Sequence, residues 1–376
     1  MKLQRNGRTK ALAIGAMALV SSLSLAACGS DNNPAPTPSG SSAGSASAAI
    51  ACGKGGQLLA SGSTAQGNAI DVWKAAYGSA CSSTTITYGG GGSGAGVQQF
   101  NQGKVAFAGS DSALKPTEVD ASKAVCKTGQ GIDLPMVAGL VSVVFNVDGV
   151  KNLVLDGPTI AKIFDSKITT WNDPAIAALN PGVTLPSAPI QAIHRSDDSG
   201  TTQNFTTYLS KAGGGNWTHA PSKTWAGTGG QSASLSAGVS AQIKQVKNSI
   251  GYVELSYAQI NNLTSASIAT GATKPVDATA ANAATTFANA KIVGTGSDLS
   301  LSLDYATKAE GAYPIVLVTY EIVCDKGNNP ATLDTLKSFL TYTISDAGQQ
   351  AIGDKGYVPL PKELASKVQA VIPTLA

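Results

Sequence analysis

Strands and helices alternate between residues 57 and 109, and this alternation is the feature that most constrains the fold. Apolar or β-branched runs predict the strands, and apolar residues at helical spacing predict the helices between them. The predicted strands are 57–61, 84–88 and 105–109, and the predicted helices are 65–77 and 97–102. Because a strand–helix–strand unit is right-handed and joins parallel strands, this order predicts an α/β fold with a parallel sheet.

Three polar residues follow the ends of these strands. Thr64 comes after the first strand, Ser93 after the second and Asp111 after the third. Ligands of open parallel sheets bind beyond the carboxyl ends of the strands. We therefore expect these three residues to face one crevice.

The rest of the chain predicts a second α/β segment and a return to the first. The long apolar strands 136–146 and 313–320 are expected to carry the chain out of the first lobe and back. The Ala/Thr-rich stretch 264–288 carries little information, and no element is assigned to it. The other predicted elements are the strands 188–193 and 249–254 and the helices 159–164, 203–209, 239–247, 331–342 and 361–371.

A length of 376 residues is enough for two domains. We expect two α/β lobes that are joined by a two-stranded hinge, with the ligand cleft between them. Residues 51–147 and 315–376 would form lobe I, and residues 148–314 would form lobe II.

The first 27 residues are predicted to be a lipoprotein signal peptide. A basic start is followed by the apolar run 11–25, which falls short of the roughly 20 residues of a membrane-spanning helix. The sequence Leu-Ala-Ala-Cys-Gly that ends at Gly29 resembles a bacterial lipobox, so we expect Cys28 to carry a lipid on the extracytoplasmic face of the cell membrane. An unprocessed membrane anchor is the less favoured alternative. Residues 28–50 are rich in Ser, Pro, Gly and Ala, which predicts a flexible tether.

Four cysteines remain after Cys28, and an even number in an exported protein predicts disulfides. They allow three pairings. Cys52 and Cys81 each precede a predicted strand of one strand–helix–strand unit, which favours the pair Cys52–Cys81 and leaves Cys126–Cys324. No Cys-x-x-Cys pair occurs, so a zinc site is not expected.

The composition argues against several classes of function. The net charge is only +3, without a basic block interleaved with aromatic residues, so nucleic-acid binding is not expected. The only histidines are His194 and His219, which disfavours a histidine-dependent catalytic site or a metal centre. We expect neither a metal nor a cofactor.

The stretch from Arg195 to Thr201 predicts an anion site. Ser199-Gly200-Thr201 lies between a predicted strand and a predicted helix, where free N–H groups and the helix dipole favour an anion. Arg195 adds a permanent cation with a fork of donors, and Asp197 is placed to hold it by a salt bridge. An ordinary helix cap beside a surface arginine is the alternative interpretation.

Asp111 is unusual in an anion site because a carboxylate repels an anion unless the ligand carries a proton that it can accept. Hydrogen phosphate has such a proton and sulfate has none, so Asp111 would admit phosphate and reject sulfate. A surface aspartate is the alternative. The glycine-rich run 89–96 lacks the Gly-Lys-Ser/Thr ending of nucleotide-binding P-loops, which disfavours a P-loop NTPase.

An ordered set of motifs across the mature region resembles the phosphate-binding lipoproteins of bacterial high-affinity phosphate ABC transporters. The set consists of Ala-Ser-Gly-Ser-Thr at 60–64, Tyr-Gly-Gly-Gly-Gly-Ser-Gly at 88–94, Ala-Gly-Ser-Asp at 108–111, Thr-Trp-Asn-Asp-Pro at 170–174, Leu-Asn-Pro-Gly at 179–182, Arg-Ser-Asp-Asp-Ser-Gly-Thr at 195–201 and Ile-Gly-Tyr-Val-Glu at 250–254. The resemblance implies the type II periplasmic-binding-protein fold.

The resemblance also implies a set of ligand contacts. Phosphate would be held by Ser63, Thr64, Ala65, Ser93, Asp111, Arg195, Ser199, Gly200 and Thr201. Asp111 would accept the phosphate proton, and Asp197 would orient Arg195, although Asp198 remains an alternative partner. Ala65 replaces an aromatic residue of some relatives, which should be tolerated because that contact uses the backbone N–H. We expect His194 to pack or to lie at the rim of the site.

The resemblance implies a binding protein and not an enzyme. It would capture inorganic phosphate as a monomer and deliver it to the membrane permease subunits of the transporter. Three alternatives remain open at this point. They are a receptor for another oxyanion such as sulfate or a phosphonate, a phosphoesterase that uses Ser93 or Ser199, and a surface lipoprotein with an adhesive or antigenic role.

Overall fold

The computed structural model describes residues 50–376. The predicted signal peptide, the lipidation site at Cys28 and nearly all of the predicted tether lie outside these residues. Within the described part of the chain, no helix is both long and apolar enough to cross a membrane.

One curved mixed sheet organises the molecule, with its strands in the order β2-β1-β3-β13-β4-β8-β6-β7 and with β9 also paired to β4. The three strands at one end are parallel to each other, as are the three at the other end, whereas β4 and β13 are antiparallel to their neighbours. The strand bounds are β1 (Gly56–Gly62), β2 (Thr84–Gly90), β3 (Phe107–Ser110), β4 (Gly131–Asn146), β6 (Gln191–Arg195), β7 (Gln231–Ala233), β8 (Ser249–Glu254), β9 (Thr264–Ser265) and β13 (Val316–Cys324). The predicted α/β class is confirmed.

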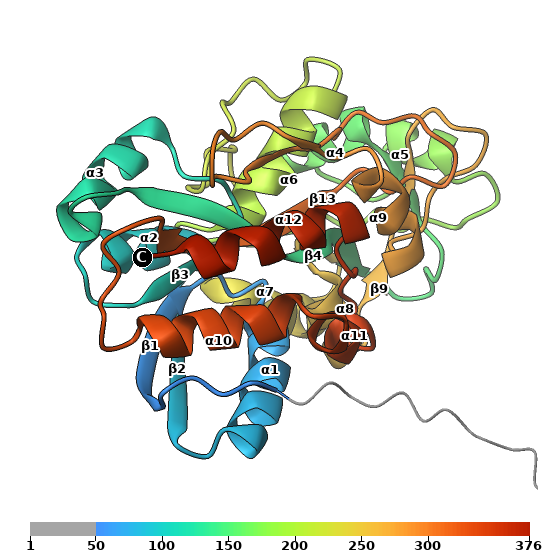
Figure 1. Ribbon diagram of the computed structural model, residues 1–376. Helices are drawn as coiled ribbons and strands as arrows, with labels where there is room; N and C mark the ends of the chain where they lie inside the picture. The colour runs from blue at the N-terminus through green and yellow to red at the C-terminus, as the bar shows by residue number, and fades with distance from the viewer. Residues whose placement is uncertain (1–49) are drawn as a thin grey trace, which may run out of the picture. The chain divides into compact units, whose positions relative to one another are not determined.

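Two further small sheets pair β5 (Val154–Asp156) with β10 (Ser267–Ala269) and β11 (Lys291–Ile292) with β12 (Leu301–Ser302). Helices cover the faces of the main sheet (Figure 1). Their bounds are α1 (Gly67–Ala80), α2 (Ser93–Asn101), α3 (Pro116–Cys126), α4 (Gly157–Phe164), α5 (Pro174–Leu179), α6 (Gly200–Ala212), α7 (Leu235–Gln245), α8 (Leu255–Asn261), α9 (Ala280–Phe287), α10 (Leu333–Ile344), α11 (Asp346–Gly353), α12 (Lys362–Val371) and the 3-10 turn η1 (Ile372–Thr374).

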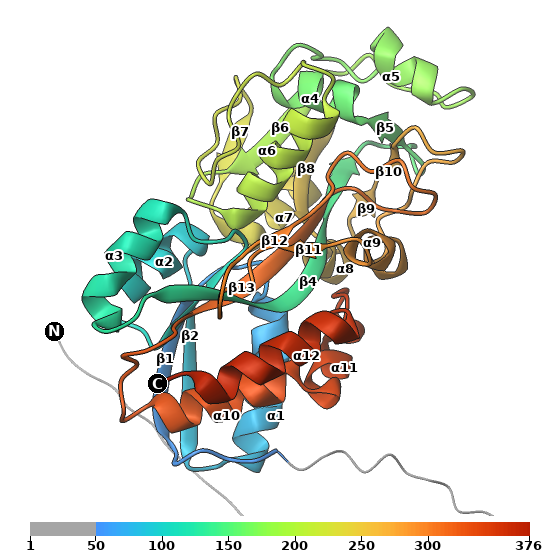
Figure 2. The ribbon, with the colours of Figure 1, turned by 45° about the horizontal axis from the view of Figure 1, so that its top comes forward.

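Strand β4 links the two ends of the sheet. Its first part, up to Leu140, pairs with β13, and its last part, from Val141 onward, pairs with β8. Figure 2 shows β4 and β13 running between the part that contains β1 and β2 and the part that contains β6 and β8. The prediction started this strand at Met136, five residues late, because Asp133 and Pro135 interrupt the apolar pattern although both are paired in the sheet.

Helix α2 begins earlier than predicted. It starts at Ser93, immediately after the positive-φ turn at Gly91 and Gly92, and not at Val97. The two glycines of Ser-Gly-Ala-Gly have low helix propensity, so the sequence predicts a loop there. The close packing of α2 against β1 requires a glycine at position 96, because a Cβ atom there would lie 2.5 Å from the Cα of Gly62.

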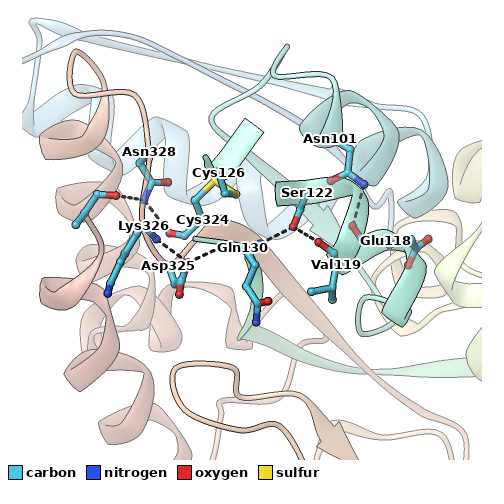
Figure 3. Close-up of a disulfide and its surroundings, with 12 residues drawn as sticks. Asn101, Glu118, Val119, Ser122, Cys126, Gln130, Cys324, Asp325, Lys326 and Asn328 are labelled. Atoms are coloured by element: carbon cyan, nitrogen blue, oxygen red, sulfur yellow. Dashed lines mark hydrogen bonds between the residues drawn. A yellow bond between two sulfur atoms is a disulfide. The ribbon is translucent and has the colours of Figure 1, made fainter. Parts of the chain in front are cut away.

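The structure contains two disulfides. Cys52–Cys81 joins residues 29 positions apart, and Cys126–Cys324 joins residues 198 positions apart. These are the two pairs expected from the sequence. The second ties the end of α3 to the end of β13, where Asn328 Nδ2 donates to the Cys324 carbonyl at 2.7 Å and Asp325 accepts from Gln130 N (Figure 3).

Candidate functional site

Asp111 lies directly after β3 and is almost fully buried, with 3% of its surface exposed. Its Oδ1 atom accepts hydrogen bonds from Ser63 Oγ at 2.5 Å and from Thr319 Oγ1 at 2.7 Å. Its Oδ2 atom accepts one from Ser93 Oγ at 3.0 Å. Oδ2 therefore retains a lone pair that none of these three bonds uses.

The surroundings of Asp111 raise its pKa to about 6. Burial is the main cause, because it disfavours the charged form, and the negative charge of Glu254 adds to the rise. The hydroxyl donors Ser63, Thr319 and Ser93 act in the opposite direction and limit the rise. Asp111 is thus a carboxylate that is stabilised only by neutral donors.

Arg195 ends β6 and is 2% exposed. Its Nε and Nη2 atoms donate to the two carboxylate oxygens of Asp197, at 2.8 and 2.6 Å, which is a bidentate ion pair. Burial would raise the pKa of Asp197, but the hydrogen bonds and charge of Arg195 outweigh it and lower that pKa. The carboxylate of Asp198 instead accepts from Thr224 Oγ1 at 2.6 Å, so Asp197 is the partner of Arg195.

Helix α6 starts beside Asp111 and Ser93. Ser199 is its N-cap, with Oγ accepting from Thr202 N at 3.2 Å, and Gly200 is the first helical residue. The approach is so close that a Cβ atom at Gly200 would lie 2.5 Å from both the Asp111 Cβ and the Ser93 Oγ. Gly200 N donates to Ser93 Oγ at 3.2 Å. Only glycine fits at the point where the second strand–helix segment meets the first.

A hydrogen-bonded chain connects Thr64 with Arg195. Thr64 Oγ1 lies 2.8 Å from Ser236 Oγ, and Ser236 Oγ accepts from Arg195 Nη1 at 3.0 Å. Arg195 Nη1 also donates to Thr201 Oγ1 at 3.4 Å. All four side chains are buried. The structure therefore gathers Thr64, Ser93, Asp111, Arg195, Ser199, Gly200 and Thr201 around one location.

The remaining predicted site residues lie at the edge of this cluster. Ala65 N donates to Ser63 Oγ at 3.0 Å, next to Asp111. His194 stacks on Trp225 with ring centroids 4.8 Å apart and an interplanar angle of 9°. His194 thus has a packing role, which is one of the two roles expected for it from the sequence.

Three residues of the site were missed by the sequence prediction. They are Ser236, Thr319 and Glu254, each of which contacts a predicted site residue. Ser236 and Thr319 have no local signal. Glu254 does, because it is an acidic residue at the carboxyl end of the buried strand β8, the same kind of position that drew attention to Asp111.

The site is built from donors, one cation and carboxylates. Within residues 50–376, no group of three or more His, Cys, Asp or Glu side chains is placed to hold a metal ion. The hydroxyls and N–H groups of α6 and α2, with Arg195, can hold a small oxyanion by many hydrogen bonds at once.

The fold and the site define a class of protein. A family model described as a PBP superfamily domain matches residues 37–347. Among solved structures, the chain is similar to a high-affinity periplasmic phosphate-binding protein, PfluDING, bound with phosphate, with a TM-score of 0.67 and 21% identity over 84% of this chain and 93% of that one. A substrate-binding protein of a putative phosphate ABC transporter from Clostridium perfringens aligns with a TM-score of 0.59 and 18% identity, covering 81% of this chain and 100% of that one. The chain belongs to the PBP superfamily.

Sequence relatives identify the family within this superfamily. The phosphate-binding protein PstS 3 of Mycobacterium leprae is 42% identical and covers 100% of both chains. PstS 3 of Mycobacterium tuberculosis is 43% identical, again over 100% of both chains. The chain belongs to the PstS family of phosphate-binding proteins.

Proposed function

We propose that this chain is the extracytoplasmic substrate-binding component of a phosphate ABC transporter, which captures inorganic phosphate and delivers it to the membrane permease. The observation that carries the proposal is the burial of Asp111 and Arg195 in one hydrogen-bonded cluster. A buried carboxylate whose side-chain partners are all hydroxyl groups, close to a cation and a helix N-terminus, suits an anion that carries a proton. Family membership supports the same ligand.

Each side chain of the cluster has a distinct role in this proposal. Arg195 and the N–H groups at the start of α6 hold the phosphate oxygens, and Asp197 keeps the guanidinium in place. The other contacts come from Ser63, Thr64, Ala65, Ser93, Ser199, Gly200 and Thr201. Asp111 accepts the proton of the ligand through the lone pair that remains on Oδ2.

The proposed movement is a closure of two lobes on the ligand. Lobe I comprises residues 51–147 and 315–376, lobe II comprises residues 148–314, and the chain passes between them just after β4 and just before β13. Contacts between the two segments support it, since Gly94 N donates to the Asp198 carbonyl at 3.0 Å and Lys223 Nζ lies 3.0 Å from Glu118 Oε1. A short two-stranded connection is a common hinge.

The cellular setting belongs to the proposal as well. The mature chain would start at a lipid-modified Cys28 and stay on the extracytoplasmic face of the cell membrane as a monomer. Its tether would let the folded part reach the permease subunits.

A hydrolytic function is less well supported by the site. A serine nucleophile needs a base within hydrogen-bond reach. His219 Nε2 instead lies 3.0 Å from Asp165 Oδ1, and His194 Nδ1 lies 3.0 Å from the Arg195 carbonyl. Among the described residues, neither histidine is hydrogen-bonded to Ser93 or Ser199.

Calorimetric titration of the purified protein with phosphate and with sulfate tests the proposal. The wild type should bind phosphate and bind sulfate far more weakly. In Asp111→Asn, the amide cannot accept from the ligand at its NH₂ group, so the preference for phosphate should fall about 10- to 100-fold. Absence of phosphate binding in the wild type would refute the proposed function. Unchanged discrimination in Asp111→Asn would refute the role of Asp111.

A further inference from the structure

The side chain of Asn204 joins helix α6 to the backbone of Asp111. Asn204 is 5% exposed, lies one turn after Gly200 on α6 and is not part of the predicted ligand set. Its Nδ2 atom donates to the Asp111 carbonyl at 2.6 Å and to the Gly200 carbonyl at 2.9 Å. Its Oδ1 atom accepts from the Tyr305 hydroxyl at 2.5 Å. Both hydrogens of the amide are therefore used, and the amide is held from two sides.

These three partners allow only one orientation of the Asn204 amide. A carbonyl oxygen can only accept, so the group that faces the Asp111 and Gly200 carbonyls must be the NH₂ group. The Tyr305 hydroxyl supplies the hydrogen for the amide oxygen on the other side. If the amide were turned over, its oxygen would face two carbonyl oxygens, which is repulsive. The Tyr305 hydroxyl thus selects the orientation in which Asn204 can donate to Asp111.

Tyr305 lies on a segment that is bonded to the opposite lobe. By sequence position, residues 298–305, which we call the strap, fall within the proposed lobe II. Two backbone N–H groups of the strap nevertheless donate, at 3.0 Å, to strands of the proposed lobe I. These bonds are Leu299 N to the Asp133 carbonyl on β4 and Leu301 N to the Tyr320 hydroxyl on β13. The amide of Asn204, which belongs to lobe II, is therefore held between Asp111 and a strap that is fixed to lobe I.

We infer that Asn204 is a positioning residue that fastens α6 to Asp111 and to the strap, and that this clasp holds the two lobes closed on bound phosphate. The clasp consists of the bonds from Asn204 to the Asp111 carbonyl and from the Tyr305 hydroxyl to Asn204. The inference rests on the proposed function and deepens it, because lobe closure is what would bring α6 to the end of β3. In the proposed site Asn204 bonds protein atoms only, so it would lengthen the lifetime of the complex without recognising the anion.

The burial of the clasp makes its loss costly in the closed form. Among residues 50–376, no backbone N–H donates to the Asp111 carbonyl, so the Asn204 amide is its donor. In Asn204→Leu, closure would bury this carbonyl and the Tyr305 hydroxyl without their partner. A buried polar group that loses its partner carries a desolvation penalty, whereas water can satisfy the same group when the lobes are apart. The penalty therefore falls on the closed form.

The rates of phosphate binding test the clasp. Calorimetry gives the dissociation constant, stopped-flow tryptophan emission gives the association rate constant, and their product is the dissociation rate constant. Asn204→Leu should raise the dissociation rate constant about tenfold, or 1.4 kcal/mol, and leave the association rate constant within about twofold. Tyr305→Phe should raise the dissociation rate constant about threefold, because the amide keeps its donors but loses the bond that orients it.

A double-mutant cycle separates the clasp from two unrelated effects. In the Asn204→Leu background, Tyr305→Phe should not raise the dissociation rate constant further, because no amide is left to orient. Independent, additive losses would overturn the inference. Thr207→Val is the matched control on α6, since its hydroxyl bonds Gln203 of the same helix at 2.6 Å, and its rate constants should stay within about twofold of the wild type. A loss in Thr207→Val equal to that in Asn204→Leu would also overturn it.

The remaining outcomes distinguish a clasp from a purely structural residue. A structural role of Asn204 would lower the number of binding sites found by calorimetry, or the midpoint of urea unfolding, and leave the dissociation rate constant of the folded protein unchanged. That result would overturn the inference. Asn204→Ala repeats the test if Asn204→Leu does not fold. Failure of the wild type to bind phosphate would refute the proposed function itself, whereas binding with the same dissociation rate constant in wild type and variants would refute only the clasp.

Discussion

The two buried charged groups of the cluster, Asp111 and Arg195, differ in their partners. We call the surroundings of each the Asp111 side and the Arg195 side. Three hydroxyl groups surround Asp111, and burial raises its pKa to about 6. Arg195 has its charge balanced by the bidentate bond to Asp197, while Nη1 points to Ser236 and Thr201. The difference indicates a division of labour. In the proposed function, the Arg195 side would supply fixed donors for affinity, and the Asp111 side would supply an acceptor for the proton of the ligand.

The largest expected effect comes from removing the cation. Arg195→Ala should weaken phosphate binding roughly a thousandfold, about 4 kcal/mol, because it deletes charged donors and leaves the partly buried Asp197 without its partner. Calorimetry measures the change. Arg195→Lys keeps the charge but not the fork of donors, so it should recover only part of the affinity. Near-wild-type affinity in Arg195→Ala would contradict the proposed contribution of Arg195 to phosphate binding.

The raised pKa of Asp111 should make the free energy of unfolding of the ligand-free protein depend on pH. Because the folded pKa of about 6 lies above the ordinary value of 3.8, the folded state binds the extra proton and loses stability as the pH rises through 6. Between pH 4.5 and pH 8, this loss is about 2 kcal/mol. Urea unfolding of Asp111→Asn should show a correspondingly smaller loss than the wild type. An equal loss in both proteins would contradict the raised pKa.

The adjacent residues Asp197 and Asp198 allow a matched comparison, because only Asp197 is bonded to Arg195. Asp197→Asn removes one of the two bonds to Arg195, so phosphate affinity should fall about tenfold, or 1.4 kcal/mol. Asp198→Asn changes a side chain that bonds Thr224 outside the cluster, and its affinity should stay within about twofold. Equal losses in both variants would mean that neither carboxylate orients Arg195.

The smallest expected effect concerns a buried acid near Asp111. Glu321 on β13 is 1% exposed, and burial raises its pKa to about 8, with the charge of Asp111 adding to the rise. The ordinary value is 4.5, so the folded state loses stability as the pH rises through 8. Between pH 7 and pH 8.5, Glu321→Gln should lose about 1 kcal/mol less stability than the wild type in urea unfolding. A larger loss in the variant would contradict the assignment.

Much of the fold follows from local patterns. The predicted bounds of β8 agree with the structure, in which Asn248 has a positive φ just before the strand and α8 begins at Leu255, directly after it. Ser199, Gly200 and Thr201 open a helix as expected, because the N-cap bond joins Ser199 to Thr202, only three positions further on. The Arg195–Asp197 pair has the same local origin, because the two residues are only two positions apart.

The contacts that escaped prediction depend on register over long stretches of chain. Thr319 reaches Asp111 across 208 positions, because antiparallel pairing sets Tyr320 of β13 opposite Ser110 of β3. Within β13 the pattern of apolar residues gives no reason to single out Thr319. Ser236, at the start of α7, reaches Thr64 across 172 positions. Pairing between distant segments creates these contacts, so residue spacing does not encode them.

In the proposed site, Asp111 accepts a proton from an anion that Arg195 holds. A high-resolution crystal structure of the protein with bound phosphate is the decisive test. We expect one phosphate oxygen at about 2.5–2.7 Å from an oxygen of Asp111, as for a charge-assisted O–H···O bond, and other oxygens on the Arg195 guanidinium and the first N–H groups of α6. A phosphate bound with all its oxygens beyond hydrogen-bond distance of Asp111 would contradict it.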